Sequence, residues 1–254
     1  MNDKKISVVI NTYNAEEYLD RVLETVKDFD EVVVCDMEST DHTIEIARKH
    51  GCKVVTFPKG NHVSAEPART FAIQSASSKW VLVIDADELV TPQLKDYLYD
   101  IIAHEDAPKG LYIPRKNFFM GRFMHCFYPD YQLRFFIREG TEWPPYVHTF
   151  PKVNGRTEKL PSKRQDLAFI HLAKNDIYDR IKKTNQYTES EIEKKKDRHF
   201  GMGALLWRPF FRFFKAYILK GGFRDGKAGF ISACYEGFYQ FVVVSKILEK
   251  SVMS

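Results

Sequence analysis

Three carboxylates stand within four residues in Asp85-Ala86-Asp87-Glu88, directly after the apolar run 80–84. Like charges this close repel, and they are costly at a partly buried strand end unless a cation offsets them. Oxygen ligands with no His/Cys pair beside them favour a hard ion such as Mg²⁺ or Mn²⁺, usually shared with phosphate oxygens. The same acids could instead merely precede and cap the next helix. The motif alone leaves both interpretations open.

Two more polar segments follow apolar runs upstream. Asn11-Thr12-Tyr13-Asn14 comes after the run 6–10, and the segment 36–43 comes after the run 31–35. The first segment has no glycine, so it cannot hold a dinucleotide pyrophosphate in the Rossmann manner, and the chain has no P-loop pattern. Enzymes of hydride transfer and P-loop enzymes are therefore poor fits. A nucleotidyltransferase is also a poor fit, because no glycine-rich G-x-G-x-R loop stands near the N-terminus.

The elements that must position these segments alternate along the first hundred residues. Strands are expected at 6–10, 31–36, 53–57 and 80–85, and helices at 15–27, 43–50, 68–76 and from Thr91-Pro92, with Asp41 as an N-cap. Apolar strands separated by helices predict a parallel sheet covered on both faces. Ligands of such sheets bind outside the carboxyl ends of the strands, where the polar segments lie.

The order of these motifs resembles family 2 glycosyltransferases, the inverting enzymes with the nucleotide-sugar fold called GT-A. The resemblance rests on the Tyr-Asn after the first strand, on D-x-x-S-x-D-x-T from Asp36, on Ala68-Arg69 and on the Asp-x-Asp at 85–87. It implies an α/β fold, a parallel-dominated sheet between helices, with a helical C-terminal extension. Two positions depart from the pattern: Glu38 stands where glycine is common, and Thr70 replaces the usual Asn.

The resemblance also implies roles. The nucleotide of the donor would be bound by Thr12, Tyr13, Asn14 and Asp36, with Asp36 accepting a hydrogen bond from the base. Arg69 would reach the diphosphate or hold the carboxylates, Asp85 and Ala86 would face the ribose and the metal shell, and Asp87 would bind Mg²⁺ or Mn²⁺.

The middle of the chain resembles the branch of this family that makes bacterial surface polysaccharide and the lipopolysaccharide core. That pattern is carried by Arg115, Asn117, Phe119 and Gly121, by the run Pro129–Phe136, and by Trp143 and Val147-His148. An inverting transferase needs one general base, and Asp130 is the first candidate and His148 the second. Arg134 would meet phosphate or Asp130, and His171 could complete the metal site or be structural.

Trp143 could stack on a sugar or pack in the core. Thr149 replaces the glutamate of the V-H-E pattern of that branch.

The C-terminal part is basic and aromatic. Residues 174–230 hold 14 Lys/Arg against 7 Asp/Glu, and residues 205–230 hold eight aromatics and six Lys/Arg against one acid. From Phe210, apolar residues at 213, 214, 217 and 218 alternate with Arg208, Arg212 and Lys215, which predicts a helix with aromatics on one side and cations on another. Such a helix suits the surface of an anionic bilayer, and a homodimer interface or a second core is the competing interpretation.

We therefore expect a nucleotide-sugar-binding half at 1–105, an acceptor-binding half of the same domain at 106–172, and a helical membrane-associating or dimerising region at 173–254. The expected activity is metal-dependent transfer of a sugar, from a UDP-sugar, to a lipid-linked saccharide. The chain begins without a signal-peptide pattern and has no apolar run of membrane-spanning length, so we expect a cytoplasmic protein peripheral at the inner face of the membrane. No nucleic-acid partner is expected. A catalytically inactive module of the same fold, binding a membrane or a protein, is the alternative.

Overall fold

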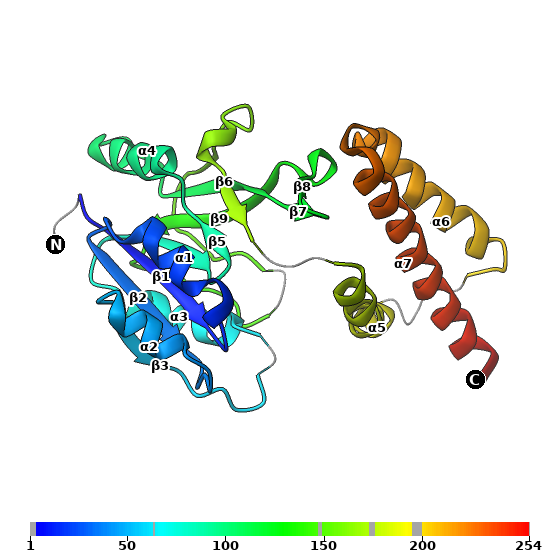
Figure 1. Ribbon diagram of the computed structural model, residues 1–254, viewed down its shortest axis with the longest axis horizontal. Coiled ribbons are helices and arrows are strands. Elements are labelled where there is room, and N and C mark those ends of the chain that lie inside the picture. The colour runs from blue at the N-terminus through cyan, green and yellow to red at the C-terminus, as the bar shows by residue number, and fades with distance from the viewer. Residues whose placement is uncertain (1–3, 63, 147–148, 173–175, 195–199, 254) are drawn as a thin grey trace. The chain divides into compact units, whose positions relative to one another are not determined.

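A computed structural model describes residues 4–62, 64–146, 149–172, 176–194 and 200–253. The chain divides into two compact units (Figure 1). We call Met1–Lys116 with Pro129–Leu172 the sheet unit, and Asn117–Tyr128 with Ala173–Ser254 the helical unit. Each unit is described by itself.

The described part of the sheet unit holds one nine-stranded sheet in the order β3-β2-β1-β4-β9-β6-β11-β5, with β10 beside β6. Its strands are β1 (Ile6–Thr12), β2 (Glu31–Asp36), β3 (Lys53–Thr56), β4 (Trp80–Asp85), β5 (Glu88–Leu89), β6 (Gly110–Lys116), β9 (Asp130–Ile137), β10 (Thr157–Lys159) and β11 (Phe169–His171). β1 pairs in parallel with β2 and β4, and β2 with β3. β9 runs antiparallel between β4 and β6. The predicted α/β class with a mostly parallel sheet is confirmed.

Helices cover both faces of this sheet because the central strands β1 and β4 are buried on both faces. Val8, Ile10 and Leu82 face one cluster with α1 (Glu16–Val26), α2 (Thr43–Lys49) and α4 (Pro92–Ala103). The alternate residues Val9 and Val83 face a second cluster with α3 (Glu66–Gln74). This alternation is what a strand with two-residue periodicity produces. Side chains at odd-numbered positions of β1 and β4 therefore face α3. Asn11 and Asp85, at the ends of these strands, lie on this face.

Two expected boundaries shift slightly. The third helix begins at Glu66 and not at Ala68, and the third strand ends at Thr56. Asp41 lies one residue before the N-cap position of α2, yet its carboxylate accepts hydrogen bonds from the backbone N–H and the hydroxyl of Thr43. It caps the helix from that position.

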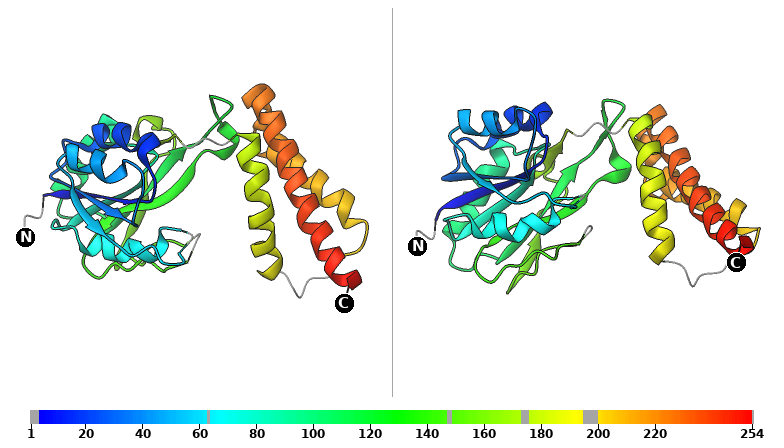
Figure 2. Two further views of the ribbon diagram at one scale, coloured as in Figure 1. Left: turned by 60° about the horizontal axis from the view of Figure 1, so that its bottom comes forward. Right: turned by 90° about the horizontal axis from the view of Figure 1, so that it is seen from below.

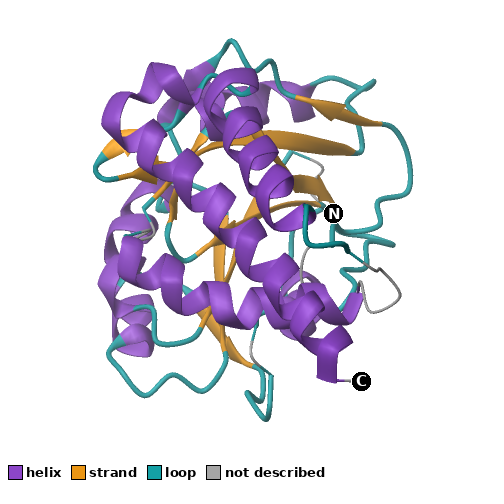
Figure 3. Cartoon of the chain, turned by 90° about the vertical axis from the view of Figure 1, so that its right-hand side faces the viewer, coloured by secondary structure: helices purple, strands orange, loops and turns teal. Residues whose placement is uncertain are grey.

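The helical unit contains three long helices, α5 (Ile177–Lys194), α6 (Ala204–Phe214) and α7 (Gly226–Met253). α6 continues into a π-helical turn, η3 (Lys215–Leu219), and a 3-10 turn, η4 (Gly222–Asp225), then leads into α7, so that α6 and α7 lie side by side (Figures 2 and 3). The segment 117–128 adds the hairpin β7 (Phe118–Phe119) and β8 (Arg122–Phe123), followed by the turn η1 (His125–Phe127). A further 3-10 turn, η2 (Gln165–Leu167), belongs to the sheet unit.

The polarity of α6 differs from the expectation. Its exposed side chains are apolar, whereas Arg212 is half-buried and donates to Glu236 of α7 at 3.1 Å. Arg208 is also half-buried and lies against the rings of Phe200 and Trp207. The cations of this helix are therefore partly used in packing inside the unit and do not form an open cationic face. Among the described residues, no helix is long and apolar enough to cross a membrane.

Candidate active site

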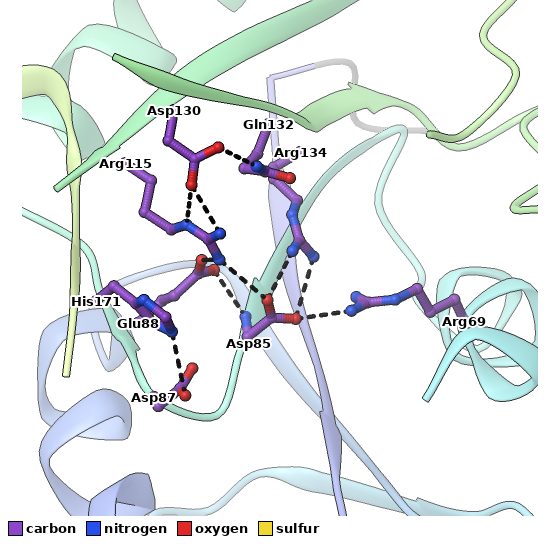
Figure 4. A network of polar contacts seen from close by, with 9 residues as sticks. All are labelled: Arg69, Asp85, Asp87, Glu88, Arg115, Asp130, Gln132, Arg134 and His171. Atoms are coloured by element: carbon purple, nitrogen blue, oxygen red, sulfur yellow. Dashed lines mark hydrogen bonds and ion pairs between the residues drawn. The ribbon is translucent and has the colours of Figure 1, made fainter. Parts of the chain in front are cut away.

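Asp85, the last residue of β4, lies between two buried arginines (Figure 4). Arg69 of α3 donates to its Oδ1 at 2.8 Å, and Arg134 of β9 donates to both oxygens at 3.2 and 2.7 Å. α3, β4 and β9 each contribute one member, because Asp85 and Arg134 extend the strand faces that pack against α3. Nη1 of Arg115 lies 3.9 Å from Oδ2 of Asp85, so this carboxylate is shared among three guanidinium groups.

The charges set the titration of Asp85. Burial alone would raise the pKa of this carboxyl group, but the positive charges of Arg134 and Arg69 lower it well below the usual range. The Asp85 carboxylate in turn raises the pKa of Arg134 against the opposing effect of burial. Glu88 also raises the pKa of Arg134, so the two arginines are balanced by more than the Asp85 carboxylate.

Several buried polar atoms beside Asp85 lack a hydrogen-bond partner among the described residues. They include Nε and Nη1 of Arg69, Nε of Arg134, the indole N–H of Trp143 and both side-chain polar atoms of Asn11. Asn11 ends β1 as the register partner of Asp85. Buried polar groups are normally paired, so a group of unpaired donors indicates a place where a ligand supplies the acceptors.

Trp143 packs beneath the arginines. It is 6% exposed, and its ring centroid lies 4.6 Å from Cζ of Arg69 and 5.4 Å from Cζ of Arg134. The backbone N–H of Trp143 donates to the hydroxyl of Thr70, which donates to the carbonyl oxygen of Trp143. Of the two interpretations of Trp143, packing is confirmed. Thr70, which replaces the Asn usual in the family pattern, thus holds the backbone of this tryptophan.

Asp87 lies on the turn between β4 and β5, and Oδ2 of its carboxylate is 3.4 Å from Nε2 of His171. The two meet because His171 of β11 pairs in antiparallel register with Glu88. A carboxylate and an imidazole fit a Mn²⁺ or Mg²⁺ ion that takes its other ligands from phosphate and water. Among the described residues, no group of three or more His, Cys, Asp or Glu side chains could hold a metal ion by itself. The residues present therefore fit an ion shared with a phosphorylated ligand.

A second charged group joins Glu88, Arg115 and Asp130. Glu88 is fully buried, accepts from the backbone N–H of Asp85 at 3.0 Å and accepts from Nη1 of Arg115 at 3.0 Å. Nε and Nη2 of Arg115 lie 2.9 and 2.8 Å from Oδ2 of Asp130, and Gln132 donates to Oδ1 at 2.9 Å. Glu88 and Asp130 raise the pKa of Arg115, although burial opposes them. The side chain of Asp130, the first residue of β9, is thus held in a fixed orientation.

The ends of β1 and β2 form a third group. Asp36 is fully buried and accepts from the hydroxyl of Thr12 at 2.9 Å and from the backbone N–H of Ser39 at 2.8 Å. Tyr13 is 48% exposed, with Nζ of Lys59 4.8 Å from its ring centroid. An exposed aromatic ring at a strand end can accept a flat ligand.

Two residues of this group adopt a left-handed backbone. Asn14 has φ 48° and Glu38 has φ 61°. The latter explains why glycine is common at this position of the pattern, since glycine adopts this conformation without steric cost. The Glu38 carboxylate accepts from the backbone N–H of Lys59 at 3.0 Å.

The structure thus brings most of the sequence-predicted residues to one edge of the sheet. Asp85 joins Arg69 and Arg134; Asp87 joins His171; and Ala86, half-buried, lies between the two aspartates. Asp130 lies beside Arg115 and not beside Arg134. His148 lies outside the described residues.

The sequence motifs include Glu88 and Arg115, but sequence reasoning assigned neither residue a role in the site. Arg115 is the register partner of Asp130, and this pairing of β6 with β9 carries no local signal in the sequence.

Comparison with known proteins shows the family to which the chain belongs. Residues 7–152 match the family described as Glycosyl transferase family 2. The chain is 29% identical to an uncharacterized glycosyltransferase of Rickettsia typhi, over 99% of this chain and 89% of that protein. It is 25% identical to the lipopolysaccharide core biosynthesis glycosyltransferase LpsC of Rhizobium meliloti, over 98% and 93% of the two chains. The crystal structure of S. aureus TarS superposes with a TM-score of 0.50 and 20% identity, over 66% of this chain and 37% of that chain.

Proposed function

Because the chain belongs to glycosyl transferase family 2 and has the GT-A fold, we propose that it transfers a sugar from a UDP-sugar, with inversion, to a lipid-linked saccharide. It is a glycosyltransferase by family. The observation that supports a diphosphate-linked donor is the pair of buried arginines around Asp85. Their unpaired donors lie beside Asp85, which with Asn11 stands at the strand ends where ligands of α/β sheets bind.

The diphosphate of the donor supplies the acceptors that these groups lack. Arg69 and Arg134 have planar guanidinium forks that match phosphate oxygens, and both lie in a desolvated site where such bonds are strong. They hold the diphosphate before the reaction and stabilise the added negative charge as it leaves. The base stacks on Tyr13, and the buried Asp36 accepts from its ring N–H.

In this proposal Asp87 and His171 would hold a divalent cation, Mn²⁺ or Mg²⁺, which would supply charge neutralisation for the leaving diphosphate. The contribution of this chain is to present one carboxylate from the β4–β5 turn and one imidazole from β11 side by side. Asp85 stays engaged with the arginines and orients them.

Asp130 is the general base in this account. It accepts the proton of the acceptor hydroxyl while that oxygen bonds to the anomeric carbon of the donor and the bond from that carbon to the diphosphate oxygen breaks. The electron pair of that bond leaves with UDP, and the new glycosidic bond has inverted configuration. Arg115 and Gln132 hold the carboxylate in place for this step.

The name of the relative LpsC, a lipopolysaccharide core biosynthesis glycosyltransferase, supports the proposed class of acceptor. With a lipid-linked saccharide as acceptor, we propose that the protein acts in the cytoplasm at the inner face of the cell membrane. The inactive module remains the second candidate, favoured by Thr149 at the glutamate position of the pattern. In the structure its hydroxyl donates to backbone carbonyl oxygens of Pro144 and Tyr146 and caps a turn.

Calorimetry with UDP separates the two candidates. The enzyme is expected to bind UDP in the presence of Mn²⁺ and to lose most of this affinity in chelator. Arg134→Gln is expected to weaken binding by roughly tenfold or more, because a charge-assisted bond to a phosphate is lost. A matched control is Arg164→Gln, since Arg164 forms an exposed pair with Asp166 elsewhere in the sheet unit. Absence of UDP binding with and without Mn²⁺ would favour the inactive module.

A further inference from the structure

Five large apolar side chains of α6 are exposed together on one face. We call them the α6 apolar face: Leu206, Trp207, Phe210, Phe211 and Phe214, exposed between 40 and 78%. Leu206, Phe210 and Phe214 recur every four residues, as do Trp207 and Phe211, so all five lie within one helical stripe. The opposite stripe packs on α7, where Gly237 brings its backbone close to the carbonyl oxygen of Pro209. This face is therefore left partly open by α7, and Trp207 and Phe211 also line a cavity with Gln240 of α7.

The charge exposed beyond the C-terminal end of α6 has one sign. Three cations are exposed: Lys220 directly after η3, Arg224 on η4 and Lys227 on the first turn of α7. The single acid of residues 205–230 is Asp225, which is 1% exposed and is bonded to His125. The exposed charge of this segment is therefore cationic.

We propose that the α6 apolar face is a docking surface for a bilayer that contains anionic lipids. The helix lies along the headgroup boundary with its aromatic stripe among the acyl chains, and the three cations meet lipid phosphates. Trp207 is suited to this boundary, because its ring is apolar and its N–H needs a polar partner. A second copy of the chain would bring further cations and no exposed acid from this segment, whereas an anionic bilayer supplies the missing charge. The inference goes beyond the proposed function and does not depend on catalysis.

Trp207 itself provides the test. The other two tryptophans, Trp80 and Trp143, are 4% and 6% exposed, whereas Trp207 is 56% exposed. With the full chain, phosphatidylcholine vesicles that contain phosphatidylglycerol are expected to shift the tryptophan emission to shorter wavelength. Brominated acyl chains are expected to quench this emission, and Trp207→Phe is expected to abolish both effects while the protein still floats with the vesicles. No shift, no quenching and no flotation of the wild-type chain would overturn the proposal.

Paired variants locate the surface. Phe210→Gln with Phe214→Gln is expected to weaken vesicle binding by roughly tenfold or more. Tyr187→Gln on α5, which removes a 53% exposed aromatic outside the face, should leave it unchanged. Replacing Lys220, Arg224 and Lys227 by Gln should weaken binding to anionic vesicles most strongly at low salt. Equal binding by the aromatic double variant and the Tyr187 control would also overturn the proposal.

Two further readouts separate this surface from the active site and from a dimer interface. Asp87→Ala is expected to retain vesicle binding, and the Phe210/Phe214 double variant is expected to retain UDP binding by calorimetry. Light scattering on the wild-type chain without lipid identifies the competing occupant. If the chain is a dimer that the double variant dissociates, and the wild type does not bind vesicles, the face is an interface between copies and the bilayer proposal is wrong.

Discussion

Asp130 is the proposed general base, and its role can be tested separately from that of the Asp85 cluster. Its carboxylate is oriented by Arg115 and Gln132, and it lies on β9, four residues before the Arg134 that holds Asp85. The proposed role requires that the acceptor hydroxyl approach the carboxylate closely, because the rate gain from a positioned base depends on orientation and proximity.

Asp130→Asn is expected to reduce the rate of sugar transfer by roughly 10²–10⁴-fold, because the amide cannot take the proton. Affinity for UDP with Mn²⁺ is expected to stay near the wild-type value, since Asp130 does not contact the Asp85 cluster directly in the structure. Transfer assays and calorimetry on the same preparation measure both quantities. Asp166→Asn, at an exposed arginine pair, is the matched control. A variant with unchanged transfer would remove Asp130 as the base.

The ion pair of Glu88 with Arg115 makes a prediction about stability. Glu88 is fully buried, so Arg115→Gln leaves a buried carboxylate without its charged partner. We expect the free energy of unfolding to fall by about 3–5 kcal/mol. In a Glu88→Gln background the same substitution should cost much less, because no buried charge is stranded. Urea unfolding of the four proteins of this cycle measures the difference, and simple additivity would show that the pair is not coupled.

At the scale of single residues, the sequence predicted which residues belong to the site better than it predicted which of them contact one another. Asp85, Arg69 and Asp87 could be chosen because their motifs lie at strand ends, and the parallel sheet brings strand ends together. Glu88 and Arg115 could not be chosen as a pair, because they meet through the register of β5, β11 and β6, which no local pattern determines. Trp143 was undecided because an indole in a loop carries no periodicity.

At the scale of elements, the close approach of η4 and α7 depends on glycine. A Cβ added at Gly229 would lie 1.9 Å from the carbonyl oxygen of Gly222 and 2.8 Å from Cβ of Asp225. Both contacts involve backbone or a buried side chain, so neither can give way without moving a turn. Glycine has a low helix propensity, and at this position of α7 the resulting loss of stability is offset by the close packing that glycine allows.

Gly229→Ala is therefore expected to destabilise the helical unit by about 1–3 kcal/mol or more, as overpacking does. Thermal unfolding followed by circular dichroism measures the effect. Gly201→Ala serves as the control, because an added Cβ there meets nothing within 4 Å. Similar melting temperatures for the two variants would show that the η4 turn is not packed against α7 as described.

Asp225 links η4 to the segment 125–126. Its carboxylate accepts from the backbone N–H of His125 at 2.9 Å, from that of Cys126 at 3.1 Å and from Nδ1 of His125 at 2.7 Å. Burial acts to raise the pKa of Asp225, but these hydrogen bonds lower it below the usual value. A carboxyl group with a lowered folded-state pKa stabilises the fold at pH above its unfolded-state pKa of about 4. That stabilisation is lost as the pH falls through the folded-state pKa.

Asp225→Asn is expected to lower the free energy of unfolding by about 1–3 kcal/mol at neutral pH, because one amide oxygen cannot replace two carboxylate oxygens. The difference from wild type should shrink as the pH falls below about 4, where the unfolded state gains a proton, and vanish below the lower folded-state pKa. Denaturant unfolding at a series of pH values gives this difference. A gap that stays constant from neutral to acidic pH would contradict the assigned role.

At the scale of the whole molecule, the two units differ in how far the sequence predicts them. The alternation of apolar strands and helices in the sheet unit gave the correct fold class, since the two-residue and 3.6-residue periods are local properties. The orientation of α6 was not predictable in the same way. The aromatic and basic residues of α6 can be either buried or exposed. The position of Arg212 depends on its hydrogen bond to Glu236 of α7, a residue distant in the sequence. The antiparallel position of β9 between β4 and β6 likewise depends on long-range pairing.

The release of UDP from a UDP-sugar, measured with the wild-type chain and with Asp87→Ala, tests the central claim most directly. UDP-glucose and UDP-N-acetylglucosamine serve as donors, with Mn²⁺ or with chelator. The account predicts that wild-type release depends on the divalent ion, and that Asp87→Ala loses most of it while keeping the wild-type melting temperature. Full turnover by Asp87→Ala, or wild-type turnover that is unchanged in chelator, would contradict the account.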